Sequence, residues 1–220
     1  MPLFLATLAI RRQSQTISFG SATEMLDIFG MQQGGSQYQR LIESFKRIFG
    51  ATIFFGRDVQ RERVKVIHHS RFNFMSEARI WYARDRTAHV AGRVPKHVVL
   101  STDFFREAMD HPIPTDLEAA KALSCAPAAR DLFTWLSYRC FLAKGEERVP
   151  LFGDYGLASQ LGSRDYARTR KFREKLEGWL KLVRAMWPDC PARISRDRRY
   201  LELAQANAVA SRPATRLSEP

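Results

Sequence analysis

The fold of this chain is decided by residues 154–203, whose sequence is DYGLASQLGSRDYARTRKFREKLEGWLKLVRAMWPDCPARISRDRRYLEL. A first helix is predicted over 155–161, because its leucine and alanine side chains recur at helical spacing. Gly162 ends this helix, since glycine readily takes the left-handed conformation of a helix C-terminus, and Ser163 caps the next one. The second helix, predicted over 164–183, has one apolar stripe surrounded by arginine and lysine.

Two short strands are predicted after the basic helix. Pro188 and Pro191 interrupt the chain, and the stretches 192–195 and 200–203 then have the pattern of strands around the basic turn RDRR at 196–199. Helix, turn, basic helix and basic hairpin are the order of a winged helix-turn-helix. In that motif the second helix enters the major groove of DNA and the hairpin lies on flanking phosphates.

The first half of the chain repeats this order of elements without sequence identity. Ser21 is expected to cap one internal helix, with Glu24 completing a capping box, and Ser36 to cap the next. The predicted elements are a helix over 3–12, a strand over 16–19, helices over 24–29 and 37–49, and strands over 51–55 and 64–69 joined by a polar turn over 56–63.

The middle of the chain contains the best domain boundary. Two prolines stiffen residues 110–114, and prolines remove backbone donors. Thr115 is expected to cap the helix that follows. The other predicted elements here are strands over 72–81 and 98–100, a helix capped by Ser101, helices over 117–123 and 128–143, and a strand over 149–152.

These elements predict an α+β fold, mainly helical, with two tandem winged helix-turn-helix domains. The N-terminal winged-helix domain, with an extended wing, is expected over 1–110. The C-terminal winged-helix DNA-binding domain is expected over 111–204. Residues 205–220 are rich in Ala, Ser, Arg and Pro, and we expect them to form a disordered tail.

The composition favours a folded protein with a polyanionic partner. The chain has 220 residues, 45% of them hydrophobic, with a formal net charge of +12 and a pI of about 10.1. Nucleic acid and an acidic membrane surface are the partners that such a charge favours, and a merely basic soluble protein is the alternative. The apolar segment 3–10 is too short to span a membrane, and its arginines follow it instead of preceding it, unlike those of a signal peptide. Three widely spaced cysteines indicate reduced cytoplasmic thiols.

The predicted reading helices and wings supply the candidate DNA-binding residues. Arginine and lysine bind guanine O6 and N7, and glutamine suits adenine N6 and N7, whereas wing arginines hold phosphates. The alternative for each single side chain is a solvated surface charge. The candidates are Gln37, Gln39 and Arg40 on the first reading helix, Arg57, Arg61 and Arg63 in the first wing, Arg164, Arg168, Arg170, Lys171 and Lys175 on the second reading helix, and Arg196, Arg198 and Arg199 in the second wing.

Catalytic functions find little support in the residues. A tyrosine nicking enzyme needs two histidines on one face of a strand, but His68 and His69 are adjacent and point to opposite faces. The chain has no glycine-rich loop that ends in Gly-Lys-Ser or Gly-Lys-Thr. Trp135, Tyr138 and Phe141 are expected in the core at helical spacing, not as base-stacking residues. We therefore predict a protein that is not an enzyme, with no metal and no cofactor.

The chain resembles plasmid replication initiator proteins of the RepA/RepC type from Gram-negative bacteria, over roughly residues 3–203. Members of that family begin well upstream of the first helix, whereas this chain begins almost at it. The stretches that carry the resemblance are LATLA at 5–9 with Arg12-Gln13-Ser14, Gly34-Gly35, PTDL at 114–117 with Ala119 and Leu123, DLFTWLSYR at 131–139 and FREKL at 172–176.

The resemblance implies a cytoplasmic, plasmid-associated bacterial protein. Two winged-helix domains would bind repeated double-stranded DNA sites at a plasmid origin, open the origin and recruit host replication proteins. A homodimer is also implied, and no membrane partner. The alternative function is a winged-helix transcriptional regulator, in which one reading domain is usually coupled to a ligand-binding or dimerisation domain.

Overall fold

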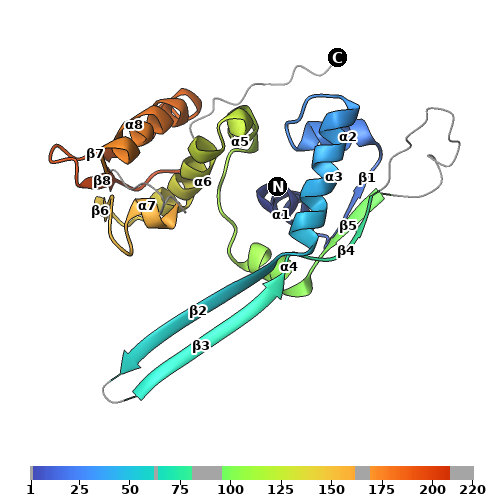
Figure 1. The fold of residues 1–220 in the computed structure, drawn as a ribbon, viewed down its shortest axis with the longest axis horizontal. Coiled ribbons are helices and arrows are strands. Elements are labelled where there is room, and N and C mark those ends of the chain that lie inside the picture. Colours follow the sequence, from blue (N-terminus) through green and yellow to red (C-terminus); the bar gives the residue numbers. More distant parts are fainter. Residues whose placement is uncertain (1, 62–63, 81–95, 162–168, 209–220) are drawn as a thin grey trace, which may run out of the picture. The chain divides into compact units, whose positions relative to one another are not determined.

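The structure of the chain is a computed structural model that describes residues 2–61, 64–80, 96–161 and 169–208, with side chains described outside 54–70. Two compact units, Met1–Pro112 and Ile113–Pro220, divide the chain at a point within the proline-containing stretch 110–114 (Figure 1). Both units combine helices with small antiparallel sheets, which confirms the predicted α+β class. No helix in the described part is long and apolar enough to cross a membrane.

The first unit contains four helices and five strands among its described residues. Its three-stranded sheet has the order β1-β5-β4, and β2 and β3 form a separate two-stranded ladder. The elements are α1 (Pro2–Arg12), β1 (Thr16–Phe19), α2 (Ala22–Ile28), α3 (Gly35–Phe49), β2 (Thr52–Arg61), β3 (Val64–Asn73), β4 (Met75–Arg79), β5 (Lys96–Leu100) and α4 (Thr102–Asp110).

Aromatic side chains hold the helices of the first unit together. The ring of Phe29, after α2, meets Phe4 of α1 edge-on at a centroid distance of 6.0 Å and Phe45 of α3 at 5.6 Å. Ile17 of β1 and Val98 of β5 are partners in the ladder, and both are fully buried. The inward-facing side of the sheet therefore shares one core with the three helices.

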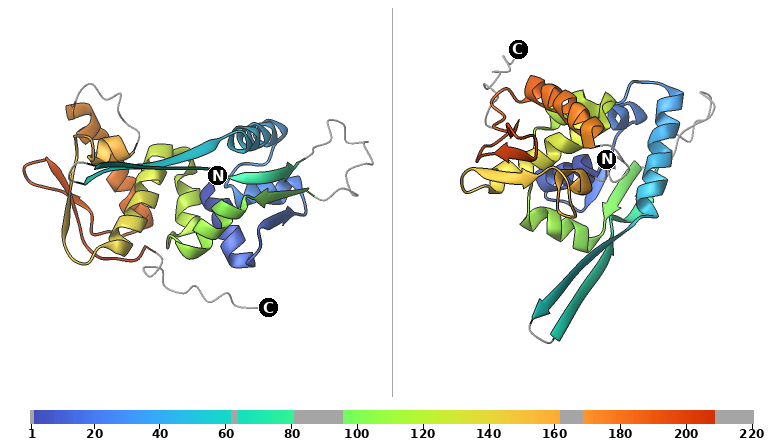
Figure 2. Two further views of the ribbon diagram at one scale, coloured as in Figure 1. Left: turned by 90° about the horizontal axis from the view of Figure 1, so that it is seen from below. Right: turned by 60° about the vertical axis from the view of Figure 1, so that its left-hand side comes forward.

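The long β2–β3 hairpin corrects the predicted first wing. Residues 56–61 were expected in a turn, but the ladder pairs Arg57 with His68 and Arg61 with Val64, so both arginines lie in β2. The partner of β1 is β5, and among the described residues β2 and β3 pair only with each other. Figure 1 and the right-hand view of Figure 2 show the hairpin extending away from the helices and sheet of its own unit.

Helix caps agree with the sequence at two positions and differ at three. Ser21 and Ser101 cap α2 and α4, accepting hydrogen bonds from backbone N–H groups at 3.0 and 3.2 Å. Glu24 accepts from the N–H of Gly20 at 2.6 Å, one residue before the predicted capping-box partner. The N-cap of α3 is Gly34 instead of Ser36. The N-cap of α5 is Asp116 instead of Thr115, whose buried hydroxyl has no partner within the described structure.

The second unit packs two long helices side by side against a small sheet. Its sheet has the order β6-β8-β7. The elements are α5 (Leu117–Ala122), the 3-10 helix η2 (Leu123–Cys125), α6 (Pro127–Leu142), β6 (Glu147–Pro150), α7 (Leu157–Gln160), α8 (Thr169–Met186), β7 (Arg193–Ile194) and β8 (Tyr200–Leu203).

The core of the second unit is built around two large aromatic side chains. Phe133 of α6 meets Trp187, just after α8, edge-on at 6.4 Å. Phe172 of α8 is fully buried and contacts the rings of Phe152 at 5.6 Å and Trp179 at 5.9 Å. The indole of Trp135 donates a hydrogen bond to Gln160 at 2.9 Å, which connects α6 to α7. These contacts fix the position of α8 within its unit.

Three expectations for the second unit need correction. Tyr138 and Phe141 were predicted in the core, but they are 42% and 46% exposed. The strand expected over 149–152 begins and ends two residues earlier, as β6. Residues 205–208 were expected in a disordered tail, yet the N–H of Ala206 donates to the Cys140 carbonyl of α6 at 3.1 Å and Ala208 is buried. The remainder of the expected tail lies outside the described residues.

Candidate nucleic-acid interface

Helix α8 presents a basic surface opposite its buried stripe. Phe172, Leu176, Leu180 and Val183 are buried, whereas the candidates Arg170, Lys171 and Lys175 are exposed. The side chain of Arg170 is 90% exposed and pairs with Glu174 at 2.9 Å. Amphipathic packing thus leaves these cations on the side of α8 that faces away from the core. The candidates Arg164 and Arg168 lie outside the described residues.

The turn between β7 and β8 is organised by one carboxylate. Asp197 accepts hydrogen bonds from the Ser195 hydroxyl at 2.5 Å and from the N–H of Arg199 at 3.1 Å. These two bonds hold the pKa of the Asp197 carboxyl below its usual range. The N–H of Arg198 closes the turn on the Ser195 carbonyl at 2.9 Å. Arg198 follows at a φ of 56°, a conformation that commonly completes hairpin loops of this kind.

Two arginines connect this turn to helix α8. The guanidinium of Arg198 donates to the Glu177 carboxylate at 2.5 Å, and the Nε of Arg173 donates to the Arg198 carbonyl at 2.9 Å. Arg173 also lies over the ring of Phe152 at 5.1 Å. The candidate Arg198 is therefore engaged with α8, while Arg196 and Arg199 are exposed beside it. Neither Arg173 nor Glu177 was among the candidates, because this contact depends on how the turn folds back onto the helix.

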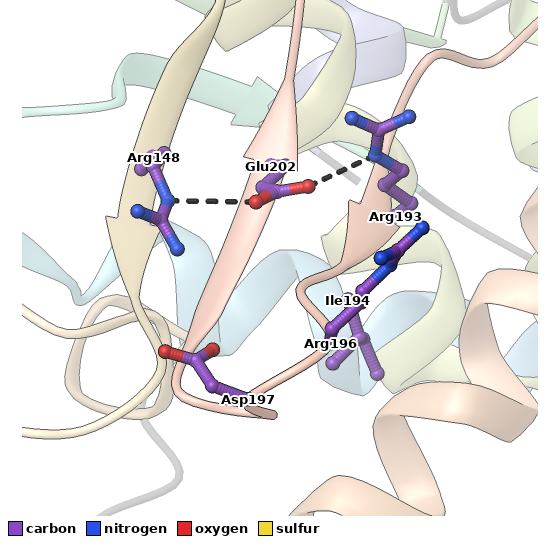
Figure 3. A pocket seen from close by; sticks show the side chains of 6 residues that line it. All are labelled: Arg148, Arg193, Ile194, Arg196, Asp197 and Glu202. Carbon is purple, nitrogen blue, oxygen red and sulfur yellow. Dashed lines mark hydrogen bonds and ion pairs between the residues drawn. The ribbon is translucent and has the colours of Figure 1, made fainter.

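A charged row crosses all three strands of the β6-β8-β7 sheet. The register places Arg148 of β6 and Arg193 of β7 on either side of Glu202 of β8 (Figure 3). Their Nε atoms lie 3.4 and 2.9 Å from the two oxygens of Glu202. The hydrogen bond to Glu202 raises the pKa of the Arg193 guanidinium, and Arg148 lies 4.5 Å from the centre of the Tyr200 ring. Sequence reasoning missed Arg148 and Arg193, although both stand at polar positions of predicted or neighbouring strands.

In the first unit, α3 carries the candidate reading residues. Tyr38, Leu41 and Phe45 are buried, Gln39 and Arg40 are exposed, and Gln37 is half-buried. Arg57 and Arg61 are placed by their backbone in β2, and Arg63 lies outside the described residues. The candidates of the first unit are therefore divided between α3 and the separate hairpin.

Comparison with known proteins identifies the family. A model of the family described as plasmid-encoded RepA protein matches residues 11–150, which is more than half of the chain. The chain belongs to the plasmid-encoded RepA family. The resemblance noted from the short motifs is thereby confirmed, and no curated protein matches the chain.

Two solved structures have the fold of this RepA-family chain. The crystal structure of RctB domains 2 and 3 superposes with a TM-score of 0.52 and 14% identity, covering 91% of this chain and 78% of that one. A crystal structure of selenomethionine derivatives of the same two RctB domains also gives 0.52 and 14%, over 82% and 67%. At this identity the likeness concerns the fold alone.

The family match and the candidate interface overlap only in part. The matched residues end at the last residue of β6, so they include α3 and the β2–β3 hairpin. Helix α8 and strands β7 and β8 lie beyond them. In this RepA-family chain the described basic surface of the second unit therefore stands on its own geometry.

Proposed function

We propose that this RepA-family chain is a sequence-specific DNA-binding initiator of plasmid replication. It binds repeated sites at the plasmid origin, promotes opening of the origin and recruits host replication proteins. The observation that carries the proposal is a basic helix-and-hairpin surface on a chain whose family is plasmid-encoded RepA. Its action is binding, without catalytic residues, metal or cofactor, in the bacterial cytoplasm on plasmid DNA.

The order of elements supports two tandem winged-helix domains. The second unit runs α6, β6, α7, α8, β7, β8, and its sheet places the last strand between the first and the middle one. The first unit runs α1, β1, α2, α3, then β4 and β5 after the hairpin, and its sheet has the same arrangement. In this proposal α3 and α8 are the recognition helices that enter major grooves.

Different side chains carry sequence reading and backbone binding. Arg164, Arg168 and Lys171 contact base edges from α8 and its start, as Gln37, Gln39 and Arg40 do from α3. Phosphates are held by Arg196 and Arg199, by Arg170 and Lys175, and by Arg57, Arg61 and Arg63 of the first hairpin. Arg198 has a further task, because its bond to Glu177 sets the position of the wing on α8.

A winged-helix transcriptional regulator is the second candidate. Such proteins usually couple one reading domain to a ligand-binding or dimerisation domain. The same sheet arrangement occurs in both units of this chain, which favours the initiator. A homodimer is compatible with either function, because symmetric dimers read paired half-sites.

The test is binding of the purified chain to fragments tiled across its own replicon. The assay is made at about 150 mM salt with excess unrelated competitor DNA, because non-specific binding depends on salt. We expect one or two fragments to be retained, and these to carry evenly spaced repeats. Retention of a single promoter palindrome would favour the regulator. Equal retention of every fragment would contradict sequence-specific reading.

A further inference from the structure

We propose that the outer face of the β6-β8-β7 sheet is a clamp for one phosphate of the DNA backbone. The clamp consists of Arg148, Arg193 and Arg196, with Glu202 as the residue that positions the first two. This inference rests on the proposed function and assigns a phosphate-binding site to residues beyond the predicted wing turn. The three arginines, Glu202, Asp197 and Ile194 line one shallow pocket (Figure 3).

The strand alternation explains why these side chains share one face. Leu201 and Leu203 of β8 are buried against the core, so Tyr200 and Glu202 lie on the opposite face. Arg148 and Arg193 are the direct ladder partners of Glu202. The row is therefore fixed by backbone pairing and does not depend on flexible side chains finding one another.

The geometry of the ion pairs leaves the anion-binding nitrogens available. Arg148 and Arg193 both approach Glu202 through Nε. Within the described part of the chain, no hydrogen bond is made by the Nη nitrogens of either residue, which are the ones that grip phosphate oxygens. Glu202 thus orients two guanidinium groups while leaving their Nη ends free for a second anion, and Arg196 brings a third.

The carboxylates around the pocket are already engaged. Glu202 accepts from the two arginines, and Asp197 accepts from the Ser195 hydroxyl and the Arg199 N–H. A neighbouring depression on the same sheet includes Glu146 and Glu147, of which Glu147 binds Arg139 at 2.6 Å. These acids lie toward the start of β6, so the phosphate fits at the end of the row nearest the β7–β8 turn.

Stability alone is a weak reason for such a row. The side chains of Arg148 and Arg193 are 57% and 66% exposed, and exposed ion pairs contribute little to folding. A preorganised pair of guanidinium groups is well suited to a phosphate, because planar forks bind its oxygens in a fixed orientation. The site also lies in the hairpin that flanks a recognition helix in the proposed function.

The first test combines Arg148→Ala with Arg193→Ala and measures affinity for retained and unrelated fragments across a salt series. We expect affinity for every fragment to fall about tenfold, as for the loss of charged hydrogen bonds. The slope of log K against log salt should shrink by about 1, with the ranking of fragments unchanged. The matched control, Arg11→Ala with Arg106→Ala, removes two exposed arginines of the first unit and should leave affinity and slope near the wild-type values.

The second test is Glu202→Gln, which removes the negative charge while the amide oxygen still accepts hydrogen bonds from the arginines. Binding to every fragment should tighten severalfold if a phosphate lies beside this row. Weaker binding by Glu202→Gln, a wild-type salt slope in the double arginine variant, or a loss confined to one fragment would overturn the clamp. Absence of DNA binding by the wild-type chain would instead overturn the proposed function itself, so the two failures are distinguishable.

Discussion

The two units use one order of elements but connect the hairpin to the helix differently. In the second unit, β7 and β8 follow α8 directly and complete the sheet with β6. In the first unit, the β2–β3 hairpin stands between α3 and the strands β4 and β5 that complete the sheet with β1. An insertion at this place leaves the sheet arrangement intact, so the hairpin that follows a helix in sequence need not be the one that pairs with the first strand.

The comparison also separates positioning from contact. In the second unit, Arg173 and Arg198 bind the turn to α8, and this fixes where the exposed arginines of the turn lie. The hairpin of the first unit forms ten ladder pairs with itself, from Thr52 with Asn73 to Arg61 with Val64. A two-stranded ribbon alone is marginally stable in water, so we expect the first hairpin to be ordered more firmly when DNA is bound.

The largest expected effect tests whether the units are separate folding bodies. Phe172→Ala removes a fully buried ring from the second unit, and Phe45→Ala removes a buried ring from the first. Each should lower the free energy of unfolding of its own unit by about 3–5 kcal/mol, because the cavity cannot be refilled. Hydrogen exchange followed by mass spectrometry would report each unit on its own.

Protection should fall in the unit that carries the substitution and stay unchanged in the other. Equal loss of protection in both units, from either substitution, would show that they fold as one cooperative body and would break the comparison.

A smaller effect is expected from Arg198→Ala, which removes the bond between the wing turn and α8. Affinity for all DNA fragments should fall about tenfold, more than for Arg196→Ala, because the wing loses its position as well as a charge. Binding titrations on retained and unrelated fragments measure this. Glu177→Gln is the matched variant, since it weakens the same bond from the other side. If Glu177→Gln leaves affinity at the wild-type value, Arg198 acts only as a direct phosphate contact.

The smallest effect concerns Gly178, in the middle of α8. A Cβ at this position meets nothing within 4 Å, and alanine is favoured over glycine inside a helix. Gly178→Ala should therefore stabilise the second unit by about 1 kcal/mol, or raise its Tm by about 4–8 °C. Thermal unfolding measures the change. A lower Tm would mean that α8 needs glycine at this point for a reason other than space.

Local signals predicted much of the fold. The strand β1 and the start of α6 at Pro127 coincide with the prediction, because alternation and a helix-opening proline are signals within a few residues. Adjacent capping residues compete, so Asp116 rather than Thr115 caps α5. The stretch Gly56-Arg57-Asp58 has turn composition, yet distant pairing with β3 keeps it in a strand.

The candidate site was less predictable, because its geometry depends on partners far along the chain. The cations of α8 follow from its amphipathic pattern, since the buried stripe determines the exposed side. The row Arg148–Glu202–Arg193 requires the register of three strands, which no local pattern specifies. Tyr138 and Phe141 were misplaced because α6 is apolar on several faces, so its sequence does not indicate which face is buried.

The central claim is that both units read DNA, each through its own helix. Hydroxyl-radical footprinting on a retained replicon fragment tests it most directly, with wild-type chain, the variant Arg164→Ala with Arg168→Ala, and the variant Gln37→Ala with Gln39→Ala and Arg40→Ala. We predict two adjacent protected segments for the wild type, with each variant losing protection over one segment only. A single segment that neither variant changes would contradict the account.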